Sequence, residues 1–364
     1  MKQITSAFAL CLVTLMVACQ SKPTMDFETY NPPSTLVVPQ HVVTKAKFPF
    51  IDIHNHQSNM GSQNLAELAK VMDTLNMAVM VNLSGSNGSS LKQSVENIKA
   101  NEPKRFVVFA NIDFDGIGEG NWTENAVKQL EQDVSNGAKG LKIFKNLGFS
   151  VKDNKGNRVH IDDERLDAIW KKCGDLKIPV LIHTADPKPF WDPLDKNNER
   201  WLELVTRPNR KRSDTDPAPW QQLIDEQHRM FKKHPQTTFI AAHFDWYAND
   251  LEKLGKLLDD MPNVYTEFGA VIAELGRQPN AANAFFTKYQ DRILFGKDSW
   301  EPQEYTTYFR VLETKDEYFP YHKKYHAFWR MYGMGLPDEI LKKVYYKNAL
   351  RLLPSLDKSL FPAN

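Results

Sequence analysis

The sequence predicts an α/β fold, a single-domain (β/α)8 TIM barrel with long insertions after its fifth and eighth strands. From residue 48 onward, eight short apolar or β-branched runs alternate with segments of helical periodicity. The competing doubly wound sheet would need a GxGxxG turn after an early strand, and the glycines at 85 and 88 do not have that spacing. A chain of 364 residues also allows two domains, but such barrels commonly fill about 250 residues or more as one domain.

Each expected element follows from a local pattern. Strands are expected at 49–54, 77–83, 105–112, 139–144, 178–183, 237–243, 263–268 and 292–297. Helices are expected at 64–75, 90–100, 123–136, 162–176, 219–234, 249–260, 280–290 and 337–352. Asn136-Gly137 is typical of a helix end, whereas Asp162 and Asn249 are plausible N-caps.

Two connections are much longer than an ordinary loop between a strand and a helix. Residues 184–217 hold five prolines and two tryptophans, and residues 299–335 are rich in Tyr, Phe and Trp. Loops at the carboxyl ends of barrel strands usually build the active site, so these insertions are expected to form its walls. Alternatively, they bury their aromatic side chains against each other or against a neighbouring subunit.

The charge balance argues against a polyanionic partner. Lys plus Arg number 46 and Asp plus Glu 45, giving a formal net charge of +1. Nucleic acid is therefore not expected as a partner. The one basic cluster, at Arg207, Arg210, Lys211 and Arg212, could clamp an acidic substrate or remain solvated.

The N-terminus predicts export. Residues 1–18 combine Lys2 with an apolar stretch, which is typical of a signal peptide. The segment Met16-Val17-Ala18-Cys19 resembles the bacterial lipobox, which implies a lipid on Cys19 and a place in the bacterial cell envelope. Gln20 after the cysteine resembles outer-membrane lipoproteins and implies the outer membrane, facing the periplasm. A plain secretory signal is the alternative. Residues 19–47, rich in proline, are expected to form a tether, and residues 48–364 the barrel.

Histidines and a carboxylate end several expected strands. The first strand ends in His54-Asn55-His56, and His183, His243 and Asp298 follow later apolar runs. Residues two apart in an extended strand point the same way, so His54 and His56 can both reach one metal ion. In a barrel all these side chains would meet at the same rim.

This order of residues resembles that of the amidohydrolase superfamily. The segments GAKGLKIF, PVLIHTAD and ILFGKDS resemble its amidohydrolase-related branch. That branch includes aminocarboxymuconate-semialdehyde and resorcylate decarboxylases and several lactonases. The similarity spans roughly residues 48 to 353.

The resemblance implies a metal site and a catalytic pair. His54, His56, His183 and Asp298 are expected to bind one divalent cation, for which zinc suits the donor set. His243 is expected to act as acid or base, with a second-metal ligand or a structural hydrogen bond as alternatives. In two-metal members a carboxylated lysine forms a bridge, and Lys142 and Lys145 are the candidates for that role.

The expected function is hydrolysis of a C–O or C–N bond in a small substrate, a lactone, ester or amide that can be acidic. Asp298 would accept a proton from a metal-activated water, and His243 would assist the developing oxyanion or leaving group. Lys145 could neutralise a substrate carboxylate or be solvated, and Glu267 could contact substrate or orient a histidine. The alternatives are a metal-dependent non-oxidative decarboxylase and a non-catalytic ligand-binding lipoprotein. A homodimer is compatible with the sequence, because dimers are the commonest assemblies.

Overall fold

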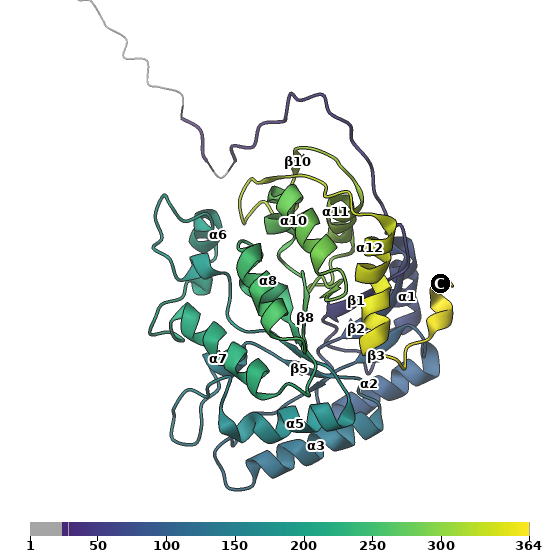
Figure 1. Cartoon of the computed structure of the whole chain (residues 1–364), viewed down its shortest axis with the longest axis vertical. Helices are drawn as coiled ribbons and strands as arrows, with labels where there is room; N and C mark the ends of the chain where they lie inside the picture. Colours follow the sequence, from purple (N-terminus) through teal and green to yellow (C-terminus); the bar gives the residue numbers. More distant parts are fainter. Residues whose placement is uncertain (1–23, 28, 364) are drawn as a thin grey trace, which may run out of the picture. The chain divides into compact units, whose positions relative to one another are not determined.

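Parallel strands and helices alternate along the chain in the computed structural model, which describes residues 24–27 and 29–363 (Figure 1). The strands of the barrel are β1 (Phe50–Asn55), β2 (Met77–Asn82), β3 (Phe106–Val108), β4 (Ala110–Asn111), β5 (Leu141–Ile143), β6 (Val180–Ile182), β7 (Phe239–Ala241), β8 (Val264–Glu267) and β9 (Ile293–Leu294). Neighbouring strands pair in parallel and in chain order. Each expected strand therefore has a counterpart.

The last strand returns to the first and closes the barrel. The backbone N–H of Ile53 donates to Phe295 O over 2.9 Å, and the N–H of Asp298 donates to His54 O over 2.7 Å. The rings of Phe50 and Phe295 also pack with their centroids 4.7 Å apart. The described residues thus form the (β/α)8 barrel that the sequence predicts.

The third strand changes partners at Phe109. β3 pairs with β2 and β4 pairs with β5, and the N–H of Phe109 donates to Asn82 O over 2.9 Å. Its buried ring lies against Gly140, where a Cβ atom would come within 2.5–2.7 Å of three ring carbons. A side chain at position 140 is therefore incompatible with this ring position.

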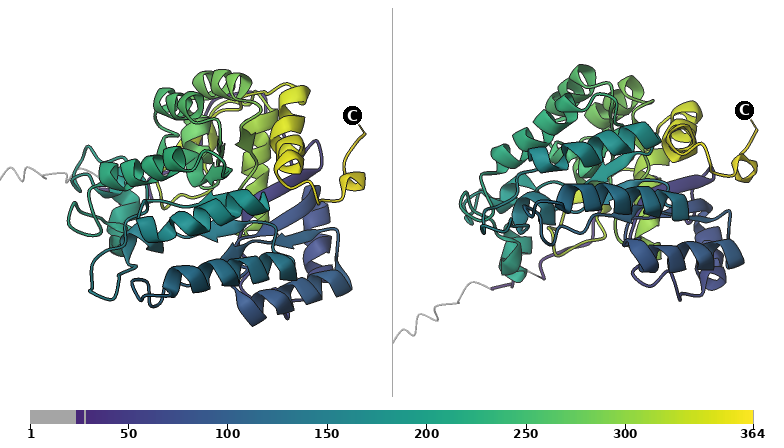
Figure 2. Two further views of the ribbon diagram at one scale, coloured as in Figure 1. Left: turned by 60° about the horizontal axis from the view of Figure 1, so that its bottom comes forward. Right: turned by 90° about the horizontal axis from the view of Figure 1, so that it is seen from below.

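The helices lie outside the strands, as the views in Figure 2 show. They are α1 (Leu65–Leu75), α2 (Gly88–Asn101), α3 (Trp122–Asn136), α5 (Asp167–Leu176), α7 (Trp220–Lys233), α8 (Leu251–Asp260) and α10 (Pro279–Lys288), and α12 (Asp338–Lys342), which continues through a π-helical turn (Lys343–Lys347) into α13 (Asn348–Leu352). These match the expected helices, and α3 ends at Asn136-Gly137 as predicted. The two predicted N-caps are wrong, because α5 follows Leu166 rather than Asp162 and α8 is capped by Asp250 rather than Asn249. Cys173 on α5 is fully buried, in keeping with its place on an apolar helix face.

The insertions contain more regular structure than the sequence suggested. The first holds α6 (Trp201–Thr206), and the second holds α11 (Pro302–Glu313) and the hairpin strands β10 (Phe319–Pro320) and β11 (Arg330–Met331). The short helices α4 (Asn146–Phe149) and α9 (Ile272–Arg277) follow β5 and β8. Helix α11 has a clear helical period of aromatic residues, but its position inside an aromatic-rich insertion obscured that pattern.

The chain divides into two units, Met1–Leu36 and Val37–Asn364. Residues 37–47, part of the predicted tether, belong to the second unit, where the N–H of His41 donates to Asp316 over 2.8 Å and that of Lys47 to Glu313 over 2.9 Å. The predicted signal peptide and Cys19 lie outside the described residues. Within the described part of the chain, no helix has both the length and the apolar character that crossing a bilayer requires.

Candidate active site

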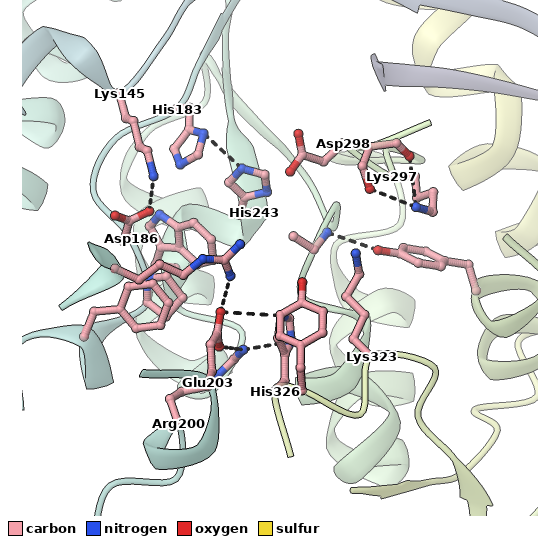
Figure 3. A pocket seen from close by; sticks show the side chains of 18 residues that line it. Lys145, His183, Asp186, Arg200, Glu203, His243, Lys297, Asp298, Lys323 and His326 are labelled. Carbon is pink, nitrogen blue, oxygen red and sulfur yellow. Dashed lines mark hydrogen bonds and ion pairs between the residues drawn. The ribbon is translucent and has the colours of Figure 1, made fainter. Parts of the chain in front are cut away.

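A cavity of about 370 Å³ lies at the carboxyl ends of the barrel strands (Figure 3). His183, His243 and Asp298, each of which follows a strand, are among the residues that line it. Both insertions contribute walls, with Asp186, Phe190, Arg200, Glu203 and Arg210 from the first and Ser299, Tyr308, Lys323, Tyr325 and His326 from the second. The insertions therefore enclose the site, as one of the two sequence alternatives proposed.

Three of the four expected metal ligands form a tight triangle. His54 Nε2 and His56 Nε2 lie 3.2 Å apart, and each lies 3.4 Å from Asp298 Oδ1. His54 lies on β1 and His56 directly follows that strand, and Asp298 reaches them from a backbone with φ of +83°. Their donor atoms are close enough to share one ion.

The chemistry of this triangle fits a divalent cation. His54 Nδ1 donates to Glu267 Oε1 over 2.8 Å, so its Nε2 carries a lone pair. His56 Nδ1 can donate to Ser84 Oγ at 2.8 Å, which leaves its own Nε2 bare. Two lone pairs and a carboxylate at these distances repel unless a cation lies between them. Ligands about 2.1 Å from a tetrahedral zinc ion would be roughly 3.4 Å apart, close to the distances found.

Burial keeps His54 neutral, as a ligand must be. Desolvation, followed by the nearby Lys142 charge, lowers the pKa of His54 to about 3. Lys142 on β5 is itself buried, and its Nζ lies 3.5 Å from His54 Nε2. Burial lowers the pKa of Lys142 to about 8. Lys142, one of the two candidates for the bridging lysine of the two-metal alternative, therefore lies at the site.

Glu267 lies beneath the cluster and is fully buried. Besides His54, its Oε1 accepts from the backbone N–H of His243 over 2.8 Å, and its Oε2 accepts from Gly269 N. Burial alone would raise the pKa of Glu267, but the charges and hydrogen bonds of His54 and His243 hold it at about 2. Of the two sequence alternatives, this position corresponds to orienting the histidines.

His243 begins a left-handed turn, residues 243–246. His243, Phe244, Asp245 and Trp246 have φ values of 58°, 54°, 54° and 56°, and none is glycine. This conformation costs about 1–2 kcal/mol per residue for L-amino acids. Four such residues in succession persist only where the surrounding contacts hold them in place, and strain of this kind concentrates at functional sites.

His183 and His243 face each other across the cavity floor. His243 Nδ1 donates to Gly269 O over 2.7 Å and His183 Nε2 donates to Ala185 O over 3.1 Å. The remaining nitrogens, His243 Nε2 and His183 Nδ1, are 3.3 Å apart, so the pair requires a shared proton or a cation. His183 is not part of the triangle of His54, His56 and Asp298, and its Nδ1 faces His243 Nε2.

The other expected binding residues are dispersed. Lys145 lines the cavity and forms an ion pair with Asp186 over 2.5 Å. Within the basic cluster, Arg210 also lines the cavity and pairs with Glu203, whereas Arg212 pairs with Asp186 and Arg207 lies over the Tyr325 ring.

Several residues that line the cavity or lie next to it were not expected from the sequence: Asp186, Arg200, Glu203, Asp245, Trp246, Tyr308, Lys323 and His326. Those that line the cavity come mostly from the insertions. The charged residues at 186, 200 and 203 stand among apolar ones, which was the only sign in the sequence that they could be buried. Their partners lie far away in the sequence, so their roles could not be predicted. The geometry as a whole defines a metal-dependent barrel enzyme.

Comparison with known families identifies the group. The model of the Amidohydrolase family matches residues 51–355, so the chain belongs to this family. It is an enzyme of the amidohydrolase superfamily, with a candidate metal site. None of the curated proteins gives a significant match.

Solved structures share the fold. A 2,6-dihydroxybenzoate decarboxylase in complex with 2,6-dihydroxybenzoate matches with a TM-score of 0.53 and 13% identity, over 84% of this chain and 99% of the other. A dihydroxybenzoic acid decarboxylase from Polaromonas sp., with bound manganese and an inhibitor, gives 0.52 and 14%, over 86% and 99%. A 4-oxalomesaconate hydratase from Rhodopseudomonas palustris gives 0.52 and 13%, over 85% and 97%. At these identities the likeness concerns the fold alone.

Proposed function

We propose that this enzyme hydrolyses a C–O or C–N bond of a small lactone, ester or amide. The observation that supports this most is the position of Asp298, which belongs to the triangle and also lines the cavity with a side chain that is 33% exposed. A divalent ion held by His54, His56 and Asp298, with His183 beside them, would polarise a carbonyl group and lower the pKa of water. We propose zinc as that ion, because imidazole and carboxylate donors suit it.

Asp298 is the proton acceptor in this proposal. Burial would raise the pKa of Asp298, but the neighbouring imidazoles, His56 foremost, stabilise the carboxylate and hold that pKa well below its usual range. The side chain is therefore a carboxylate at neutral pH. It has one oxygen directed at the histidines and a partly exposed surface from which it can accept a proton from the attacking water.

His243 acts on the opposite side of the reacting bond. Its Nδ1 is fixed by Gly269 O, so Nε2 is the nitrogen available to the cavity. In its protonated form, Nε2 donates to the developing oxyanion or to the leaving group. Trp246, whose ring centroid lies 4.6 Å from that of His243, shields one face of this imidazole from water.

Decarboxylation is the second candidate, because cations surround the cavity. Lys145, Arg210 and Lys323 could hold a substrate carboxylate, and His243 would then protonate the carbon that loses carbon dioxide. Two of the solved structures with the same fold are decarboxylases of dihydroxybenzoates.

The metal content of the chain without residues 1–18 is the primary test. We expect about one zinc ion per chain by elemental mass spectrometry, and close to none in His54→Ala. His41→Ala, which changes an exposed histidine away from the site, is the matched control. A ratio of two would indicate a two-metal site with a carboxylated Lys142 as the bridge. No bound metal after reconstitution would reject metal catalysis and favour the ligand-binding alternative.

A substrate panel then separates the two reactions. Hydrolysis of 4-nitrophenyl acetate and of simple lactones, lost in His243→Ala with metal content retained, would support the hydrolase. Release of carbon dioxide from 2,6-dihydroxybenzoate without turnover of esters, lactones or amides would support the decarboxylase.

We also propose that Cys19 carries a lipid that anchors the enzyme to the bacterial outer membrane, where residues 20–36 space it from the bilayer. Support comes from the lipobox-like segment alone. Incorporation of labelled palmitate into the wild-type chain and its absence in Cys19→Ser would test the anchor. Equal partitioning of the two proteins into the membrane fraction would contradict it.

A further inference from the structure

The left-handed turn, residues 243–246, is held by a different element at each residue. The backbone N–H of His243 is bound by Glu267 on β8. Phe244 is fully buried, and its ring packs against Phe268 and against Phe286 on α10, with centroids 6.0 and 5.8 Å away. Trp246 Nε1 donates to Thr184 O, in the insertion after β6, over 2.8 Å. Because each of these contacts comes from a different part of the fold, together they fix the orientation of the turn.

Asp245 provides the attachment to helix α7. Its carboxylate is buried, with Oδ2 2.6 Å from His228 Nε2 and Oδ1 accepting from Gln227 Nε2. Neither donor lines the cavity, and both lie on the outer layer of the barrel. The pair therefore connects a surface helix to the turn without touching the space where substrate would bind.

The turn places its side chains in two directions. His243 and Trp246 line the cavity, and Figure 3 shows His243 beside His183. Phe244 and Asp245, between them in sequence, are buried outside the cavity. A rotation of the turn that freed Asp245 would also displace His243 Nε2 from its position 3.3 Å from His183 Nδ1.

We propose that Asp245 is a positioning residue that, through His228 and Gln227 of α7, fixes the orientation of His243 in the active site. The two carboxylate oxygens of Asp245 each accept one hydrogen bond, from His228 and from Gln227. An asparagine of the same shape has only one oxygen that accepts, because its other terminal atom is an NH2 donor. The inference rests on the proposed function only for the catalytic role of His243, and the position of the imidazole is measurable without turnover.

The test compares Asp245→Asn with Asp225→Asn, a matched change at an exposed aspartate of α7. In zinc-loaded protein with ¹³Cε1-labelled histidine, we expect the His243 resonance, assigned with His243→Gln, to shift or broaden in Asp245→Asn and to stay in place in Asp225→Asn. With 4-nitrophenyl acetate, kcat should fall about tenfold while KM and metal content stay within about twofold, because a misplaced acid affects the chemical step.

Two further variants separate positioning from folding. Asp245→Gly removes the attachment but adopts positive φ without strain, so it should remain folded with a displaced His243 even if Asp245→Asn does not fold. His228→Gln keeps an N–H donor and should retain most of the activity that His228→Ala loses.

An unmoved His243 resonance in folded Asp245→Asn or Asp245→Gly, with kcat within twofold of the parent, would overturn the proposal. Absence of ester hydrolysis in the parent protein would count against the proposed function, while the resonance would still decide the positioning role.

Discussion

Two fully buried carboxylates surround the first histidine of the site and act in different ways. Asp52 accepts from the N–H groups of His54 and Lys297 over 3.1 Å and from the Tyr305 hydroxyl over 2.6 Å. These partners are neutral, and burial raises the pKa of Asp52 to about 6. Glu267 faces an imidazole that binds metal in the proposed function, and its pKa is about 2. Asp52 thus holds the backbone at the ends of two strands in place, whereas Glu267 orients the His54 imidazole and makes it a better electron-pair donor.

Glu267→Gln is expected to weaken zinc binding about 10- to 100-fold, because the amide loses the charge that raises the basicity of His54. The measurement is competition with a zinc chelator, using Glu252→Gln, a change in the first turn of α8, as control. Unchanged zinc affinity in a folded Glu267→Gln protein would show that Glu267 does not support the metal ligand.

The pair of His228 and Asp245 predicts a pH-dependent stability. Burial would lower the pKa of His228, but the charge and hydrogen bond of Asp245 outweigh it and raise that pKa above its usual value of about 6.5. The pair therefore stabilises the fold fully below about pH 6.5 and loses this contribution as pH rises through the raised pKa. The Tm of the parent should exceed that of His228→Gln most near pH 6, and the difference should shrink towards pH 9. A difference that grows with pH would contradict this assignment.

Sequence could predict the site residues that belong to strand ends. His54, His56 and Asp298 were expected together because parallel strands bring their carboxyl ends to one rim. Asp245 and Arg200 could not be found in this way, since their roles depend on partners on other elements. The left-handed turn was also hidden, because four residues without glycine give no local sign of positive φ.

At the scale of elements, a buried guanidinium connects the two insertions. Arg200 donates to Glu203 over 2.9 Å and to Glu274 on α9 over 2.5 Å, and its Nη1 lies 3.1 Å from His326 Nδ1 in the second insertion. Its guanidinium also lies 4.9 Å from the centroid of the Trp329 ring. The wall of the cavity is therefore built around one cation with several distant partners.

Arg200→Met is expected to lower the free energy of unfolding by about 3–5 kcal/mol, because it leaves two buried carboxylates without their common partner. Urea denaturation measures this, and Lys211→Met within the same insertion serves as control. A loss below about 1 kcal/mol would show that the carboxylates find other partners or become protonated at little cost.

The helices and strands of the barrel could be predicted from the periodicity of apolar residues, whereas the structure of the insertions could not. The helix α7 was expected because its apolar residues recur on one face, and Leu223, Ile224, Met230 and Phe231 are indeed buried. In the second insertion, Tyr305, Tyr308 and Phe309 on α11 have helical spacing, yet they lie among so many other aromatic residues that no boundary was evident. Long-range packing, which the local pattern does not encode, selects the helix there.

On the scale of the whole molecule, the boundary of the barrel unit lies before residue 48. A chain that begins at Val37 should have the same Tm as one that begins at residue 20. A chain that begins at Phe48 should melt several degrees lower, because it loses the contacts of His41 with Asp316 and of buried Ala46 with Leu75. Differential scanning fluorimetry on the three chains measures this. Equal Tm values for all three chains would show that residues 37–47 do not stabilise the barrel and belong with the tether.

The contact between Phe109 and Gly140 also limits the routes by which this barrel can diverge. A mutation that adds even a methyl group at position 140 meets a ring that already fills the space. A smaller residue at 109 would have to arise first, passing through an ancestor with a cavity where β3 meets β4. Among descendants of this sequence the two positions should therefore change in a fixed order, with residue 109 preceding residue 140.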